Sequence, residues 1–256
     1  MEEQYLICED SLEGIFTGIY EAYALRQEHE HIHIQVGEEA NLRLFAVYIR
    51  IEPDKRKAAK VAATIQRSLG EDTYYEICSA LATEDTEKGE AVYKTVVCGL
   101  KMREGRRVMG NLANPYVRKV FELARMAKNE AHHWKGFLRF QELENGILFS
   151  KIGAKNNILA FIVPHFADRL PLCNFVIYDE NRGIFAVHPA SGEWYLVMGQ
   201  ELDETQFSCY SEKERKYQEL FKYFCHKIAI NERKNLKLQQ NILPLWFQEY
   251  MIEFDK

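Results

Sequence analysis

The stretch PYVRKVFELARMAKNEAHHWKGFLRFQELENGILFSKI, from Pro115 to Ile152, decides what kind of fold the chain adopts. Asn114 supplies a cap, and a proline follows at the first helical position, which is a typical helix start. At 100° per residue, apolar side chains from Val117 to Trp134 share one face, as in an amphipathic helix that packs on a core. Two apolar runs then flank Asn145-Gly146, the strongest short-range hairpin signal in the chain. The stretch therefore predicts a long helix followed by a pair of antiparallel strands.

The residues that follow extend this pattern to a sheet. Residues 157–169 form an apolar helical stretch interrupted by Pro164, and short apolar runs at 175–178, 184–187 and 194–197 are separated by turn residues. Together with the hairpin they predict an antiparallel sheet of about five strands packed with several helices. A capping box at Ser211 opens a helix to about Arg233, and we expect four residues on its inner face: Leu220, Phe221, Phe224 and Ile228.

The preceding residues predict a helix-rich amino-terminal half. Tyr5 to Cys8 reads as a strand, and a cap at residues 10–13 opens a helix to about Leu25. A polar loop containing histidines (28–40) precedes a strand over 42–51, and three helices follow at about 54–69, 72–81 and 87–102. The fold class is α+β. We expect either two domains, 1–104 and 105–256, or one continuous unit.

Composition excludes several classes of protein. Hydrophobic residues make up 47% and charged residues 28%, which is too apolar for a disordered chain. The acidic start and the lack of an apolar stretch near ~18 residues predict a cytoplasmic protein without a membrane segment. The six cysteines contain no C-x-x-C pair, so we expect no metal and no cofactor, and in particular no cluster.

Charge is distributed unevenly along the chain. The net charge of −5 argues against indiscriminate coating of nucleic acid, but residues 105–140 contain eight basic and two acidic side chains. Arg118, Arg125 and His132 recur every seven residues and therefore share one stripe of the helix. This window predicts either a solvated face or a phosphate-contacting face made of Arg118, Arg125, Lys128, His132, Lys135 and Arg139.

The histidines allow catalytic or structural interpretations. His132 and His133 point about 100° apart on a helix, so they cannot hold one metal together, although His132 alone is a candidate site residue. The alternating histidines at 29, 31 and 33 fit either adventitious metal binding or, as we favour, a solvated cluster. His165 fits a core or a functional role equally well. The chain lacks the common nucleotide-binding and hydrolase motifs, and no pattern specifies a reaction.

Several segments together resemble one bacterial family. They are the block EAHHWKGFLRF (130–140), Pro164-His165-Phe166, Phe175 to Asp179 with Arg182, residues 230–239 with Pro244, and the amino-terminal segment 5–23 that contains Tyr20-Glu-Ala-Tyr23. In these the chain is similar to a DNA-repair or DNA-metabolism family whose members occur beside a radical-SAM DNA-modification protein. Related domains of that family are fused to uracil-DNA-glycosylase-like domains.

The resemblance implies an accessory, nucleic-acid-binding role, with DNA as the expected nucleic acid and the radical-SAM protein as the expected partner. Two alternatives remain open at this point. One is an enzyme that acts on nucleic acid through His132, His165, Asp179 or Arg182, and the other is a protein–protein adaptor without nucleic-acid contact.

Overall fold

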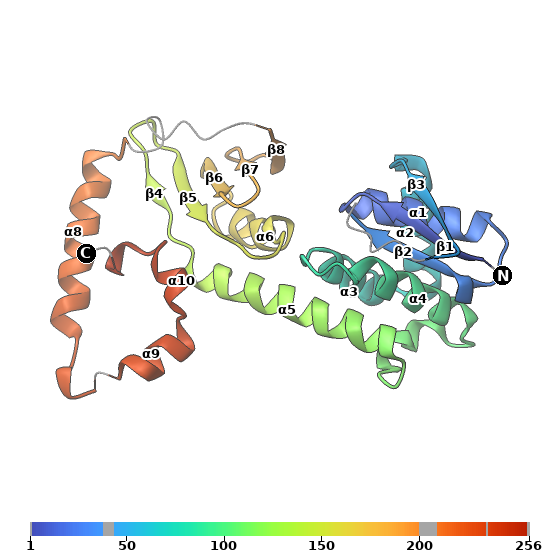
Figure 1. Cartoon of the computed structure of the whole chain (residues 1–256). Coiled ribbons are helices and arrows are strands. Elements are labelled where there is room, and N and C mark those ends of the chain that lie inside the picture. Colours follow the sequence, from blue (N-terminus) through green and yellow to red (C-terminus); the bar gives the residue numbers. More distant parts are fainter. Residues whose placement is uncertain (1, 38–43, 200–208, 234, 255–256) are drawn as a thin grey trace. The chain divides into compact units, whose positions relative to one another are not determined.

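The computed structural model describes residues 2–37, 44–199, 209–233 and 235–254 (Figure 1). The chain forms two compact units, Met1–Asn129 and Glu130–Lys256, which divide inside helix α5 (Pro115–Phe137). The division that the sequence predicts, after residue 104, stays a prediction about how the chain folds. Each unit contains a sheet of its own and several helices, so helices occur throughout the chain rather than mainly in its first half.

The first unit is built on a three-stranded parallel sheet that the sequence did not predict as a whole. Strand β1 (Glu3–Cys8) lies between β2 (Ile32–Val36) and β3 (Ala46–Ile51). Strand β2 falls in the expected polar loop, because its buried Ile and Val residues alternate with His33 and Gln35. The first residues of the strand expected over 42–51 lie outside the described residues.

Four helices pack with this sheet at nearly the positions that the sequence predicts: α1 (Leu12–Ala24), α2 (Lys55–Leu69), α3 (Glu71–Leu81) and α4 (Lys88–Lys101). Two short 3-10 helices, η1 (His29–His31) and η2 (Gly105–Gly110), were not predicted. Ser11 caps α1 by accepting a hydrogen bond from the Gly14 amide, and Asp54 caps α2 in the same way. Helix α1 approaches β1 so closely that a Cβ on Gly18 would lie 2.3 Å from Cys8 Sγ. The small residue therefore sets the spacing between helix and sheet.

The second unit contains the expected five-stranded sheet, with one difference in strand direction. The order is β4 (Gln141–Glu142), β5 (Leu148–Ile152), β6 (Phe175–Asp179), β7 (Ile184–His188) and β8 (Tyr195–Met198). Three of the four pairings are antiparallel, but β5 and β6 pair in parallel, so the sheet is mixed. The reason is α6 (Leu159–Arg169), which acts as a crossover and returns the chain to the same end of the sheet.

The carboxy-terminal segment packs less than the sequence predicts. It contains α8 (Glu212–Ile228), η3 (Asn231–Arg233), α9 (Leu236–Ile242), α10 (Leu245–Gln248) and η4 (Ile252–Phe254). The expected inner face of α8 is exposed: Leu220 and Ile228 are 61% and 59% accessible, and the helix has no buried residue. An amphipathic pattern shows that a face is suited to burial, but it does not identify the surface that covers it. The end of the chain does dock, since Phe247 and Met251 are buried.

Within the described parts of the chain, the model contains no helix with the length and apolar character needed to span a membrane.

Candidate nucleic-acid interface

Helix α5 begins and packs as its sequence predicts. Asn114 Oδ1 accepts hydrogen bonds from the amides of Tyr116 (2.9 Å) and Val117 (3.4 Å), which caps the helix before its first turn. Val117, Val120 and Ala124 are fully buried. Phe121, expected on the same face, is partly exposed, while Leu123 is buried instead. The basic residues of the stripe consequently lie on the outer side of this helix.

In the first unit, the stripe is divided between solvated and paired side chains. Arg118 and Arg125 are exposed. Lys128 donates to Glu76 Oε1 of α3 at 2.5 Å, and the neighbouring Lys119 contacts Asp85 and Glu87 at 2.9 Å each. The acidic partners of these lysines therefore come from other segments of the chain, because residues 105–140 themselves contain few acidic side chains. Arg118 and Arg125 are thus exposed, whereas Lys128 and Lys119 are paired with acids.

In the second unit, the two neighbouring histidines point in different directions. His132 is exposed, whereas His133 stacks on Phe137 and meets Phe247 edge-on. Their ring centroids are 6.3 Å apart. Trp134, the next residue, is fully buried. The arrangement agrees with the 100° step of a helix and leaves His132 as a single solvated side chain.

Three of the predicted site residues meet one further basic residue in a surface groove of the second unit. We call it the basic groove; its volume is about 410 Å³, and its lining includes Lys135, Arg139, His165 and Arg169. The first two belong to the end of α5 and the residues after it, while the other two stand four residues apart on α6. Among the residues that the structure describes, no Asp or Glu lines the groove. Its chemistry is therefore cationic.

Aromatic rings form the floor and wall of the basic groove. Phe140 meets Phe166 edge-on at 5.3 Å between ring centroids and lies 5.4 Å from Phe175. Phe166 is nearly buried, but Phe140 keeps part of its ring accessible. A partly exposed ring beside several cations offers both a stacking surface and phosphate contacts.

The cations of the groove are not equally available. The Arg139 guanidinium donates to the carbonyl oxygens of Gly136 (3.1 Å) and Leu138 (3.3 Å) and to Glu253 Oε1 (2.9 Å). Lys135 and Arg169 have no carboxylate partner within the described part of the chain. These two side chains can therefore meet a phosphate without first breaking an ion pair.

The remaining catalytic candidates, Asp179 and Arg182, belong to a buried network rather than to an open site. Asp179 is fully buried, and its Oδ2 accepts from Arg182 Nη1 at 3.1 Å. Arg182 also donates to the carbonyl oxygens of Ala154 (2.8 Å) and Lys155 (2.6 Å). Burial raises the pKa of the Asp179 carboxyl, and the nearby Arg182 opposes this shift.

Glu130 completes this network from the helix side. Its carboxylate accepts hydrogen bonds from the backbone amides of Lys155 (2.6 Å) and Asn156 (3.1 Å) and from the Asn156 side-chain amide (2.5 Å). Glu130 and Arg182 thus bind backbone groups of the loop between β5 and α6, and Asp179 pairs with Arg182. That loop leads directly into α6, the helix that carries His165 and Arg169.

Sequence reasoning missed Arg169 and the contribution of Glu130. The i to i+4 spacing from His165 to Arg169, which places both on one helix face, is the signal that could have identified the arginine. The sequence shows Glu130 only as an acidic residue among basic ones. Its structural contribution could not be predicted, because its partners are backbone amides, which no sequence pattern indicates.

The described residues contain no group of three or more His, Cys, Asp or Glu side chains arranged to hold a metal ion. His31 and His33, which the sequence places in a solvated cluster, are instead bound to acids. His31 Nδ1 lies 3.0 Å from Glu3 Oε1, and His33 bridges Glu3 Oε2 and Glu90 Oε1 at 2.9 Å each. These imidazoles support the edge of the first sheet.

Comparison with known proteins gives a family but not an activity. No curated protein and no solved structure matches the chain. Residues 86–253 match the model of a family described as Domain of unknown function, DUF4130. This range covers well over half of the chain and includes the whole basic groove together with the network around Glu130 and Asp179. The chain therefore belongs to the DUF4130 family.

Proposed function

We propose that this protein is an accessory nucleic-acid-binding protein and that the basic groove of its second unit contacts the phosphate backbone. The observation that carries the proposal is the meeting of Lys135, Arg139, His165 and Arg169 around the partly exposed Phe140. Cations provide sequence-independent affinity by releasing counterions from the backbone, and the ring provides a face for a base. The exposed Arg118 and Arg125 offer further phosphate contacts on the first unit.

Single-stranded nucleic acid fits this chemistry better than a duplex. A groove of about 410 Å³ with an aromatic wall accommodates an unstacked base or a strand end. A duplex would present only phosphates to it and leave Phe140 unused. DNA rather than RNA is proposed on the family resemblance described above.

The test is fluorescence anisotropy of the full chain with a short labelled single-stranded DNA across a salt series. The two freely available cations of the groove predict a log–log salt slope of about −1.4, at ~0.7 per neutralised phosphate on a single strand, and contacts by Arg118 and Arg125 would make it steeper. Arg169→Gln should weaken binding roughly tenfold at moderate salt and reduce the slope by about 0.7.

Arg215→Gln is the matched control, since this arginine is exposed on α8 of the same unit and does not line the groove. It should bind like the wild type. Binding that does not depend on salt, or equal effects of the two substitutions, would contradict the assignment of the groove.

The enzyme alternative is best supported at His165, while His132 is an exposed candidate outside the groove. His165 is the catalytic candidate that lines the groove, whereas Asp179 and Arg182 are engaged with each other and with backbone carbonyls. A catalytic His165 predicts that His165→Gln abolishes turnover of a bound strand while binding persists. A binding groove predicts that this variant loses little of either.

We propose further that a radical-SAM protein is the partner, as the family resemblance implies, and that it covers α8. The exposed Leu220, Phe221, Phe224 and Ile228 favour a protein contact, because contiguous apolar surface of this kind marks interaction sites. The test is anaerobic co-purification of the two proteins. Leu220→Ser with Phe224→Ser should abolish it, and Glu219→Ser, an exposed residue on the opposite, polar side of α8, should not. Recovery of the partner with the double variant would remove α8 from the proposal.

A further inference from the structure

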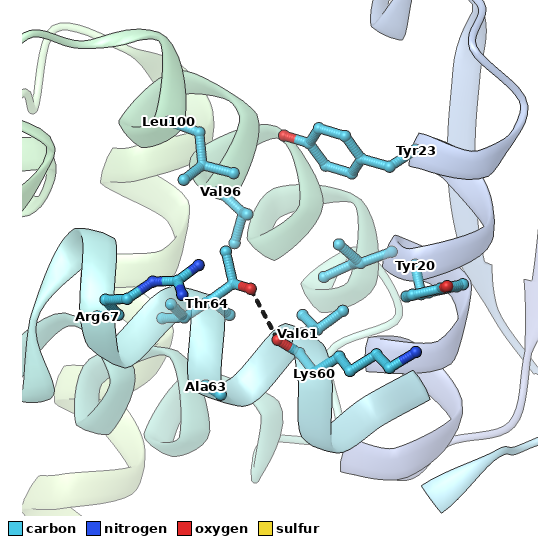
Figure 2. A pocket seen from close by; sticks show the side chains of 11 residues that line it. Tyr20, Tyr23, Lys60, Val61, Ala63, Thr64, Arg67, Val96 and Leu100 are labelled. Atoms are coloured by element: carbon cyan, nitrogen blue, oxygen red, sulfur yellow. Dashed lines mark hydrogen bonds between the residues drawn. The ribbon is translucent and has the colours of Figure 1, made fainter. Parts of the chain in front are cut away.

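A second pocket lies in the first unit, away from every residue discussed so far as a site (Figure 2). Its volume is about 510 Å³, within the roughly 300–1,000 Å³ range of small-ligand pockets. Helices α1, α2 and α4 enclose it. Ile19, Val61, Ile65, Val96 and Leu100 make most of its surface apolar. This pocket can bury the apolar body of a small molecule.

The polar groups of the pocket gather on one face of α2. Lys60, Thr64 and Arg67 stand at i, i+4 and i+7, so they lie along one stripe of that helix. Figure 2 shows the Lys60 and Arg67 side chains at the border of the apolar surface. Among the described residues no Asp or Glu lines the pocket, and neither cation has a carboxylate partner there. Its rim is therefore positive and lacks an internal counterion.

Lys60 and Arg67 differ from the neighbouring Lys57 in having no carboxylate partner among the described residues. Lys57, one turn before Lys60 on the same helix, is neutralised by Glu21 at 2.6 Å. Both ammonium groups lie over the Tyr20 ring, Lys57 at 5.8 Å and Lys60 at 5.6 Å from its centroid, but among the described residues only Lys57 has a carboxylate partner. A cation over a ring remains available to an anion, because the ring carries no net charge that must be displaced.

Two tyrosines from α1 form the remaining wall. Tyr20 and Tyr23 are one helical turn apart, and in Figure 2 both extend from α1 toward the pocket. Burial raises the pKa of Tyr23 to about 12, so its hydroxyl remains a neutral donor or acceptor. Tyr23 also packs against the His29 ring at 4.5 Å, which holds it in position. The wall thus offers ring faces and a neutral hydroxyl, but no negative charge.

We infer that this pocket binds a small amphipathic anion, with its apolar or aromatic body between the tyrosines and Leu100 and its acidic head at Lys60 and Arg67. The inference follows from the combination of an apolar interior and an unpaired cationic rim. A neutral apolar ligand would leave the cations unused, and a cationic ligand would be repelled by them. The pocket shares no lining residue with the basic groove, so this inference does not depend on the proposed function.

The experiment compares probes that share one ring system and differ in the head group, which is anionic, neutral or cationic. The full chain is titrated with 1-naphthoate, 1-naphthyl phosphate, 1-naphthalenemethanol and 1-naphthylmethylamine, and binding is followed by calorimetry or ligand-observed NMR. We expect the anions to bind about tenfold or more tightly than the alcohol, since charge-assisted hydrogen bonds are roughly twice as strong as neutral ones. The amine should bind most weakly. The two anions distinguish a carboxylate site from a phosphate site.

Substitutions test whether the probe binds in this pocket. Arg67→Gln should weaken binding of the favoured anion about tenfold and leave the alcohol unchanged. Arg56→Gln, an exposed arginine of the same helix that does not line the pocket, is the matched control. Both sites are exposed, so both variants should keep the wild-type circular dichroism spectrum. Equal binding of anion and alcohol, equal effects of the two substitutions, or no binding of any probe would overturn the inference.

Discussion

Two substitutions of Trp134 should have clearly different effects on the stability of the second unit. Trp134 is fully buried and meets Trp246, Phe247 and Tyr250 edge-on, with ring centroids 5.6, 4.9 and 5.3 Å away. Trp134→Ala removes this entire cluster contact from α5, so we expect a loss of about 3–5 kcal/mol in the free energy of unfolding.

Trp134→Phe should cost far less than its loss of volume suggests. Among the described residues the buried indole Nε1 has no hydrogen-bond partner, and an unsatisfied buried donor costs about 1–3 kcal/mol. Phenylalanine removes that donor and keeps an aromatic ring in the cluster. The cavity left by the smaller ring and the relief of the donor oppose each other, so the net change should stay within about 1 kcal/mol.

Urea unfolding of the full chain, followed by tryptophan fluorescence, measures this difference in the relevant unit. All three tryptophans, Trp134, Trp194 and Trp246, lie in the second unit, and two remain in each variant. Trp194→Ala is the control, because this side chain is only partly buried, and it should cost less than about 1 kcal/mol. If phenylalanine costs as much as alanine, the donor is satisfied and the reasoning is wrong. A cost below 1 kcal/mol for alanine would refute the packing argument itself.

Two further predictions concern polar side chains. The pKa of His33 is raised, mainly by its hydrogen bond to Glu90. The contribution of His33 to stability is therefore complete below pH 6.5 and is lost as the pH rises through the raised pKa. Thermal melts of His33→Gln should lack this loss of stability at higher pH. Glu130→Ala leaves the part-buried donors of Lys155 and Asn156 without their acceptor, so hydrogen exchange at the Asn156 amide should accelerate at least tenfold, whereas the exposed Glu122→Ala should not change it.

His29 supplies a control for the pH prediction. Burial lowers its pKa, so its effect on stability falls below pH 6.5, where the unfolded chain binds the proton more readily. A His29 variant should therefore change the acid side of the stability curve and leave the decline above pH 6.5 intact. Loss of that decline in the His29 variant would contradict the assignment to His33.

Local signals in the sequence determined most elements of this protein. Three helices are capped by a side chain that accepts a hydrogen bond from a backbone amide, as the residue types Ser11, Asp54 and Ser211 predict. The Asn145-Gly146 turn forms, with Gly146 at a φ of 78° that favours glycine. These features depend on contacts within a few residues, which a sequence displays directly.

The pairing of strands that lie far apart in the chain could not be predicted from the sequence. The parallel match of β5 with β6 depends on the path of α6, and β2 is a strand because its isoleucines find a covered face of the first sheet. Strand direction and burial are properties of the neighbours that a segment meets. The alternation of apolar and polar residues in β2 is equally compatible with an extended loop until that neighbour is known.

The candidate site divides in the same way. The sequence by itself determined that Lys135, Arg139 and His165 were candidates, from their charge, their chemistry and their place in the family resemblance. Only the tertiary structure brought them together with Arg169, paired Lys128 with Glu76 and enclosed Asp179 with Arg182. The physical reason is that the availability of a charge depends on the groups within a few ångströms of it. Those groups come from segments that the chain brings together only when it folds.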